Sequence, residues 1–156
     1  MIRIRKAQDN DLEEIARYQV AMALETESMT LDLDTVLKGV HAALHRTNPA
    51  TAGAQYYIAE DTHTNQAVGC TLTLPEWSDW RNGVVWWIHS VYVIPTYRGK
   101  GVFKAIYEHL KTEVETQSDL RGLRLFVDQS NKRAQAVYKK LGMNGDHYQL
   151  YEWMKT

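Results

Sequence analysis

The sequence predicts an α/β domain in which helices pack on a mixed sheet of parallel and antiparallel strands. The chain has 156 residues, a length typical of one domain, and 44% of its residues are hydrophobic. Short turns join the strands in the middle of the chain, which favours antiparallel pairing there. Strand and helix patterns alternate only in the last part of the chain, as parallel pairing requires. We therefore expect a single domain over residues 1–156.

The expected elements follow in the order β-α-α-β-β-β-α-β-α-β. Apolar alternation or short apolar runs between turn residues indicate strands over Ile2–Lys6, Tyr56–Ala59, Val68–Leu74, Val84–Val93, Leu123–Val127 and Tyr148–Trp153. Apolar residues three and four apart indicate helices from Leu12 to Leu24, Leu33 to Leu44, Val102 to Val114 and Ala134 to Leu141. Prolines mark two strand ends, at Pro75 and Pro95.

Charge and composition exclude several classes of protein. Lys and Arg total 18 and Asp and Glu total 19, so the net charge is −1 and we expect no nucleic-acid partner. No apolar run reaches the roughly 18 residues of a membrane span, and Met1–Arg5 lacks the apolar core of a signal peptide. We therefore expect no membrane partner. The single cysteine, Cys70, fits a reducing, cytoplasmic location and is expected to be buried and inert.

The segment Ser90–Phe103 indicates an anion site. It runs from a strand through Arg98, Gly99, Lys100 and Gly101 into a helix. Glycines let the backbone approach a ligand closely, and the N–H groups of a first helical turn can bind a phosphate. The two cations add charge at the same place. The pattern is neither a P-loop nor a dinucleotide fingerprint, and on these residues alone a plain strand-to-helix turn remains the alternative.

Two segments resemble signatures of the GNAT family of N-acetyltransferases. The first runs from Arg98 to Phe103 and is similar to the acetyl-CoA-binding signature, except that Phe103 replaces a small residue. The second runs from Asn131 to Met143 and is similar to the family's Asn-x-x-Ala-x-x-x-Tyr-x-Lys-x-Gly-Met segment. The resemblance covers essentially the whole chain, although its first half matches in element order only. It implies the acyl-CoA N-acyltransferase fold.

The resemblance also implies acetyl-CoA as co-substrate and no metal. In this family the sheet splays between its fourth and fifth strands, and the pantetheine arm enters the gap like an added strand. The main chain around Val91 and Val93 would bind the pantetheine amides, and Asn131 would bond the pantetheine or a nearby main-chain group. The implied cofactor-binding residues are Val91, Tyr92, Val93, Arg98, Gly99, Lys100, Gly101, Val102, Phe103 and Asn131.

The implied reaction is direct attack of an amine on the thioester in a ternary complex. Tyr138 matches the family tyrosine that protonates the leaving thiolate. A main-chain N–H near Val91 would stabilise the oxyanion. Tyr138 as an ordinary half-buried aromatic is the alternative.

His89 is a candidate base, because an imidazole near pKa 6.5 suits proton removal at neutral pH. Its position resembles that of a histidine in the arylalkylamine acetyltransferases. By strand alternation we expect it to share a face with Trp87, Val91 and Val93. A core histidine is the alternative role. Glu76 is the rival base, acting through a water.

The acceptor is expected to be a small cationic amine. Glu25 and Glu27 lie at the junction of the first two helices, and Trp77 and Asp79 lie in the loop after Pro75. Carboxylates and aromatic faces suit a cation, although solvated surface acids are the alternative. Asp79 is also a weaker candidate base than Glu76. A homodimer remains possible.

Two other functions are compatible with the same residues. The chain could be a non-catalytic module that binds or senses acyl-CoA, or an acyltransferase for a longer acyl group. His41 and His45 stand four apart on one helix, but no third ligand at useful spacing completes a metal site.

Overall fold

The structure, a computed structural model, describes residues 1–156 and divides into two compact units, residues 1–125 and residues 126–156. The first unit holds the whole sheet and three of the four α-helices. The single domain expected over the whole chain stays a prediction.

The sheet of the first unit is mixed, as the sequence predicted. Its five strands lie in the order β1-β2-β3-β4-β5, antiparallel except for the parallel pair β4–β5. The strands are β1 (Ile2–Lys6), β2 (Gln55–Asp61), β3 (Gln66–Ser78), β4 (Gly83–Val93) and β5 (Leu120–Leu125). The helices of this unit are α1 (Leu12–Glu27), α2 (Leu33–His45) and α3 (Val102–Thr116).

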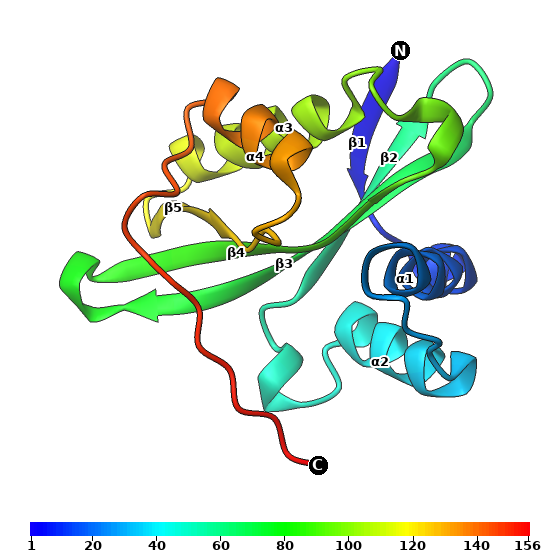
Figure 1. The fold of residues 1–156 in the computed structure, drawn as a ribbon, viewed down its shortest axis with the longest axis horizontal. Helices are drawn as coiled ribbons and strands as arrows, with labels where there is room; N and C mark the ends of the chain where they lie inside the picture. The colour runs from blue at the N-terminus through cyan, green and yellow to red at the C-terminus, as the bar shows by residue number, and fades with distance from the viewer. The chain divides into compact units, whose positions relative to one another are not determined.

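Helices cover both faces of this sheet (Figure 1). On one face α1 and α2 pack over a core that includes Ile15, Val40 and Ile58. On the other face α3 packs over a core that includes Ile106 and Tyr57. Tyr57 and Ile58 are neighbours on β2, and they point into opposite cores because successive strand residues alternate.

Strand β4 extends beyond its parallel neighbour β5. Ile88 and Leu125 form the last register pair between them, whereas β4 continues to Val93. Segment 89–93 pairs with β3 on one side and has no strand on the other. This open edge is the splay that the family resemblance implied.

A β-bulge interrupts β4 at Ser90. The pairs Cys70–Tyr92 and Leu72–His89 enclose one residue of β3 but two residues of β4. Ser90 adopts a left-handed backbone conformation with φ of 54°. One extra residue on a strand reverses which face each following side chain points to.

The bulge corrects one expectation about His89. Val91 and Val93 pack with the α3 core, whereas Tyr92 is buried in the α1/α2 core. His89 precedes the extra residue, and its partner Leu72 packs against the α1/α2 core. His89 therefore does not share a face with Val91 and Val93, because simple alternation holds only up to the bulge.

Strand β3 continues through Pro75, where the sequence predicted a stop. The last partner that β2 offers is Gln55, opposite Thr73. Beyond it β3 has a free edge, where a strand tolerates the missing N–H of proline. Glu76 and Trp77 consequently lie in β3 rather than in a loop.

The second unit contains α4 (Lys132–Lys140), as the sequence predicted. The strand predicted over Tyr148–Trp153 is wrong, since that segment forms no regular structure. Alternation alone does not make a strand, which also needs a hydrogen-bonded neighbour. Tyr148, Tyr151 and Trp153 are accordingly 84%, 85% and 86% exposed.

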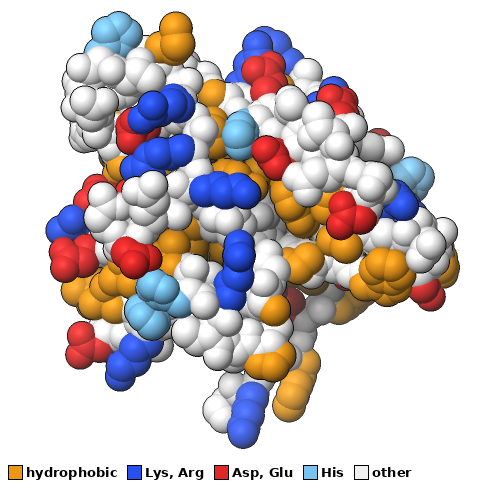
Figure 2. Space-filling view, turned by 180° about the vertical axis from the view of Figure 1, so that it is seen from behind, with side chains coloured by type: hydrophobic (Ala, Val, Ile, Leu, Met, Phe, Trp, Pro, Cys, Tyr) orange, Lys and Arg blue, Asp and Glu red, His pale blue; other side chains and the backbone are white.

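The surface carries both signs of charge. On the face drawn in Figure 2, acidic and basic side chains are interspersed rather than gathered into a field of one sign. None of the helices combines the length and the apolar character needed to cross a membrane.

Candidate functional site

The turn between β4 and α3 has the geometry of an anion cradle. Gly99 and Gly101 have φ values of 76° and 80°, which favour glycine over any residue with a side chain. Gly101 is the N-cap of α3, and Ala105 N–H donates the first helical bond to its carbonyl at 3.0 Å. The amides of the first turn, including Val102 N–H, therefore have no acceptor within the helix. A Cβ on Gly101 would meet no atom within 4 Å, so the turn opens to the outside.

The open edge of β4 leads directly into this turn. Ile94 N–H donates to Val68 O at 3.0 Å, which fixes that residue's main chain toward β3. The main-chain groups of Val93, and of Val91 two residues earlier, therefore face the edge that β5 leaves open. The Val93 carbonyl already accepts a 2.8 Å hydrogen bond from Arg98 Nε. Its N–H is the group left to meet a ligand.

Both cations of the turn have partners. Arg98 Nη2 donates to Glu25 Oε2 at 2.6 Å. Lys100 Nζ lies 5.0 Å from the centroid of the Tyr97 ring. The Tyr97 hydroxyl donates to Asp61 Oδ2 at 2.6 Å, which ties the turn to the end of β2. That hydrogen bond is the main reason why the pKa of Asp61 falls to about 2.

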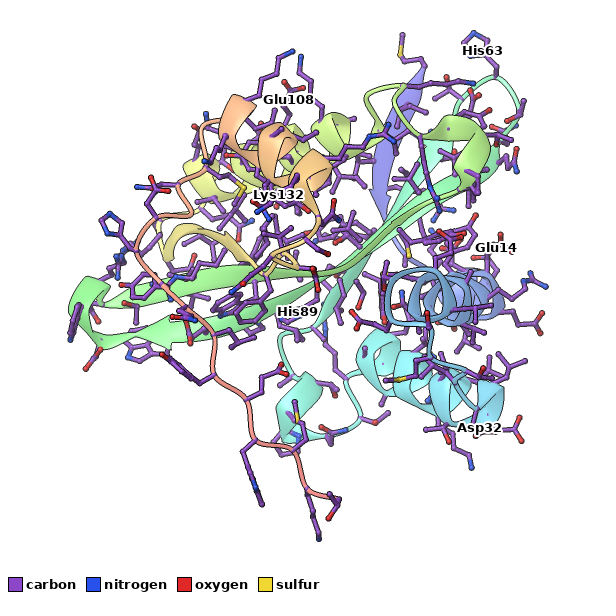
Figure 3. The ribbon with its side chains drawn as sticks, viewed as in Figure 1. Glu14, Asp32, His63, His89, Glu108 and Lys132 are labelled. Carbon is purple, nitrogen blue, oxygen red and sulfur yellow. The ribbon has the colours of Figure 1, made fainter.

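His89 lies on β4 at the start of the open edge, on the α1/α2 side of the sheet (Figure 3). Its ring centroid is 6.2 Å from that of Trp87. Burial lowers the pKa of the His89 imidazole below its usual 6.5, because a half-buried ring loses the hydration that favours its charged form. The ring is therefore neutral at pH 7 and able to accept a proton.

Glu76, the rival base, is held by a cation. Arg124 on β5 donates from Nη1 to Glu76 Oε2 at 2.7 Å, and its guanidinium lies 5.8 Å from the centroid of the Trp87 ring. No motif in the sequence marks Arg124 as the partner of Glu76. Its place between Leu123 and Leu125 in a predicted strand was the available signal, because alternation puts it on the face opposite those leucines.

The four expected acceptor residues do not form one site. Trp77 pairs with Val84 near the tip of the β3–β4 hairpin, whereas Glu25 bonds the Tyr92 hydroxyl at 3.3 Å. Residues 84 and 92 of one strand are about 25 Å apart at about 3.3 Å per residue.

The acidic residues near these two places have different surroundings. Asp79 lies at the hairpin tip, where its side chain accepts from Trp80 N–H. Glu27 is exposed in the last turn of α1. Asp32, between α1 and α2, caps α2 by accepting from Thr35 N–H at 2.8 Å.

The second unit carries Asn131 and Tyr138. Asn131 Oδ1 accepts from Ala134 N–H at 3.0 Å and caps α4, and its contact with pantetheine stays a prediction. Tyr138 lies on α4, and burial raises the pKa of its phenol. A phenol with a raised pKa stays protonated at neutral pH and can donate a proton.

The histidine pair on α2 and the single cysteine contact structural neighbours. The rings of His41 and His45 lie 4.3 Å apart, and His45 Nε2 is 3.6 Å from Asp9 Oδ1. No cluster of three or more His, Cys, Asp or Glu side chains has the arrangement of a metal site. Cys70 is fully buried, as predicted, and burial raises the pKa of its thiol to about 12.

Comparison with known proteins gives one family and several similar structures. The model of the acetyltransferase (GNAT) family matches residues 21–143. A possible acetyltransferase from Clostridium difficile 630 is 35% identical, with a TM-score of 0.86 over 100% of this chain and 99% of that one. No curated protein matches the chain.

Two more distant structures share the fold. One is a predicted acetyltransferase with acetyl-CoA from Clostridium acetobutylicum, 19% identical, with a TM-score of 0.71 over 97% of this chain and 96% of that one. The other is glucosamine-6-phosphate N-acetyltransferase from Arabidopsis thaliana, 18% identical, with a TM-score of 0.69 over 99% of each chain.

Proposed function

The chain belongs to the GNAT family of acetyltransferases, and from this premise we propose that it moves the acetyl group of acetyl-CoA to the primary amine of a small molecule. One observation carries the proposal: the open edge of β4 continues into the glycine turn and the N-terminus of α3. An extended pantetheine arm can add to such an edge as a strand would. The N–H groups of the first helical turn suit the diphosphate that follows it.

The open edge of β4 and the glycine turn follow each other in the same order as the pantetheine arm and the diphosphate of acetyl-CoA. The N–H groups of Val91 and Val93 would bond the pantetheine amides, with Tyr92 between them holding the strand against the core. The diphosphate would lie on the main chain of the turn and the first helical turn. Its donors would come from Gly99, Gly101, Val102 and Phe103, with Arg98 and Lys100 as flanking cations.

His89 is the proposed base. The amine must lose a proton as its nitrogen bonds to the thioester carbonyl carbon and the C–S bond breaks. The lowered pKa of His89 keeps the imidazole neutral and ready for that proton at pH 7. The ion pair of Glu76 with Arg124 favours His89 over Glu76, because the Glu76 carboxylate already accepts a hydrogen bond from the guanidinium.

Tyr138 is the proposed acid. The raised pKa of its phenol keeps the proton in place until the departing thiolate needs it. A main-chain N–H near Val91 would stabilise the charge that develops on the carbonyl oxygen. Asn131 caps the helix that carries Tyr138.

The proposed acceptor is a small cationic amine. It would approach the α1/α2 side of β4, the side that His89 faces. Either Trp77 and Asp79 on the hairpin or the exposed Glu27 on α1 would offer a carboxylate or an aromatic face to such a cation, because the two places are too far apart to share one small amine. The relative that acetylates glucosamine 6-phosphate supports a small molecule over a protein as acceptor. The buried free thiol of Cys70 supports a reducing, cytoplasmic location.

A thiol-release assay tests the function. The protein and acetyl-CoA are mixed with single amines from four classes, namely polyamines, arylalkylamines, amino sugars and amino acids. Release of free CoA above the rate without an amine is the expected result. Acetyl-CoA binding without release under any acceptor would contradict an enzyme and favour a binding module. Faster release from longer acyl-CoAs would favour an acyltransferase for those groups.

A further inference from the structure

We propose that Glu25 is a positioning residue, through which α1 holds the acetyl-CoA turn in place by way of Arg98 and Tyr92. The proposal rests on the proposed function, since it concerns the same acetyl-CoA site. It removes Glu25 from the set of acceptor ligands and gives it a role on the other substrate.

Both oxygens of the Glu25 carboxylate are in use. Oε2 accepts from Arg98 Nη2 at 2.6 Å, and Oε1 accepts from the Tyr92 hydroxyl at 3.3 Å. Arg98 also donates from Nε to the Val93 carbonyl at 2.8 Å, and its guanidinium lies 5.5 Å from the centroid of the Tyr92 ring. These contacts join the last turn of α1, the end of β4 and the turn before α3 into one closed network.

The network is anchored on the side of the core. Tyr92 is only 7% exposed, and its ring centroid lies 5.1 Å from that of Tyr18. The Tyr18 hydroxyl donates to Ala67 O at 2.7 Å. Burial, and next the charge of Glu25, raise the pKa of Tyr92, so its phenol stays protonated and keeps donating to Glu25.

The turn needs such an anchor because its backbone is permissive. Arg98 directly precedes Gly99, and Gly101 follows two residues later, both with positive φ. Glycine populates several backbone conformations, so a turn that contains two of them is loosely defined unless other contacts hold it. Arg98 is the side chain that crosses from this turn to α1, and Glu25 is its acceptor there.

An acceptor amine would have to compete with these bonds. A cation that bound Glu25 would displace the Arg98 guanidinium, which donates a charge-assisted hydrogen bond. Glu27 is on the same helix, is exposed and has no part in the network. The two glutamates therefore form a matched pair for experiment.

The test compares Glu25→Gln with Glu27→Gln. The glutamine keeps the size of the side chain and removes the charge that holds Arg98. Acetyl-CoA affinity, measured by titration calorimetry, should fall about twofold to fivefold in Glu25→Gln, the range expected for an exposed ion pair. It should be unchanged in Glu27→Gln. The KM for the amine should stay the same in Glu25→Gln, since the acceptor does not contact Glu25.

Two further measurements separate positioning from a general loss of structure. Glu25→Asp, which keeps the charge, should recover part of the affinity. Glu25→Gln in an Arg98→Gln background should weaken acetyl-CoA binding no further, because both changes remove the same contact. Hydrogen exchange of the amides over residues 93–101 should be faster in Glu25→Gln than in Glu27→Gln. The amides of β1 and β2 should exchange at the same rate in both variants.

Several results would overturn the proposal. Unchanged acetyl-CoA affinity in Glu25→Gln would do so, as would fully additive effects in the double variant. A raised amine KM with normal acetyl-CoA affinity would return Glu25 to the acceptor site. If the wild-type protein bound no acetyl-CoA, the proposed function would fail together with this inference, which distinguishes that failure from the others.

Discussion

Ile88 of β4 and Leu125 of β5 are the last two residues that the parallel pair of strands brings opposite each other. From this point β4 continues to Val93 with an unpaired edge, and the anion cradle begins a few residues later. His89, the proposed base, is the first residue past the end of the pairing. The edge for pantetheine, the turn for diphosphate and the base therefore follow one another along a single stretch of chain.

Gly101 tests the cradle. Gly101→Glu would put a negative charge where the diphosphate is proposed to bind, at a position with φ of 80° and open space around a new Cβ. Acetyl-CoA affinity should fall at least about tenfold, a difference of about 1.4 kcal/mol in binding free energy. Titration calorimetry measures it.

Gly101→Asn is the control for that change. Asparagine tolerates the left-handed conformation better than other residues and adds no charge. It should lose less affinity than the glutamate variant. Equal affinity of Gly101→Glu and wild type, with both folded, would remove the cradle from the proposal.

Tyr138→Phe tests the acid. The substitution keeps the ring and removes the hydroxyl, so kcat should fall about a hundredfold or more while acetyl-CoA affinity stays nearly constant. Steady-state kinetics and calorimetry on the same preparation give the two quantities. A normal kcat would assign protonation of the thiolate to water or to another donor.

The pH profile tests His89. Because burial lowers the pKa of the imidazole, kcat/KM should rise with pH through an apparent pKa below 6.5. The rate rises rather than falls with pH because only the neutral imidazole ring can accept a proton. His89→Gln should lower kcat/KM about a hundredfold and move the rising limb toward the pKa of the amine.

Glu76→Gln is the matched comparison for His89→Gln. We expect a small effect on the rate, because Glu76 is paired with Arg124. A large loss in Glu76→Gln beside a silent His89→Gln would assign the base to the carboxylate. An unchanged rate in both variants would mean that the amine loses its proton to solvent before it binds.

Ser90 tests the bulge that puts Val91 and Val93 on the face opposite His89. Ser90→Val should lower the free energy of unfolding by about 1–2 kcal/mol, because a β-branched side chain is strained at a φ of 54°. Ser90→Gly should be at least as stable as the wild type. Urea denaturation measures both.

Ser78→Val is the control for this pair, because Ser78 has an extended backbone with φ of −114°. It should change the stability little. A Ser90→Val protein as stable as wild type would show that Ser90 is not left-handed, and the reversal of faces in β4 would lose its basis.

The sequence by itself determined the local parts of this protein. Apolar spacing located α1 to α4, and alternation located β1 to β5 with small errors at the ends. The segment Arg98–Phe103 and the segment Asn131–Met143 carried the family resemblance that the comparison confirmed. These features are short-range, and each depends on residues within a few positions of one another.

Only the tertiary structure decided which distant residues meet. The extra residue at Ser90 reversed the faces of the β4 residues that follow it. No local sequence pattern predicts this bulge, because it depends on the register with β3. Glu25 and Arg98 are 73 positions apart, and their ion pair depends on how α1 packs against β4. Likewise Arg124 on β5 meets Glu76 on β3 across the intervening strand β4. The sequence does not distinguish a carboxylate that is free to bind an amine from one that is paired with an arginine. That difference depends on tertiary packing and strand register rather than on neighbouring residues in the sequence.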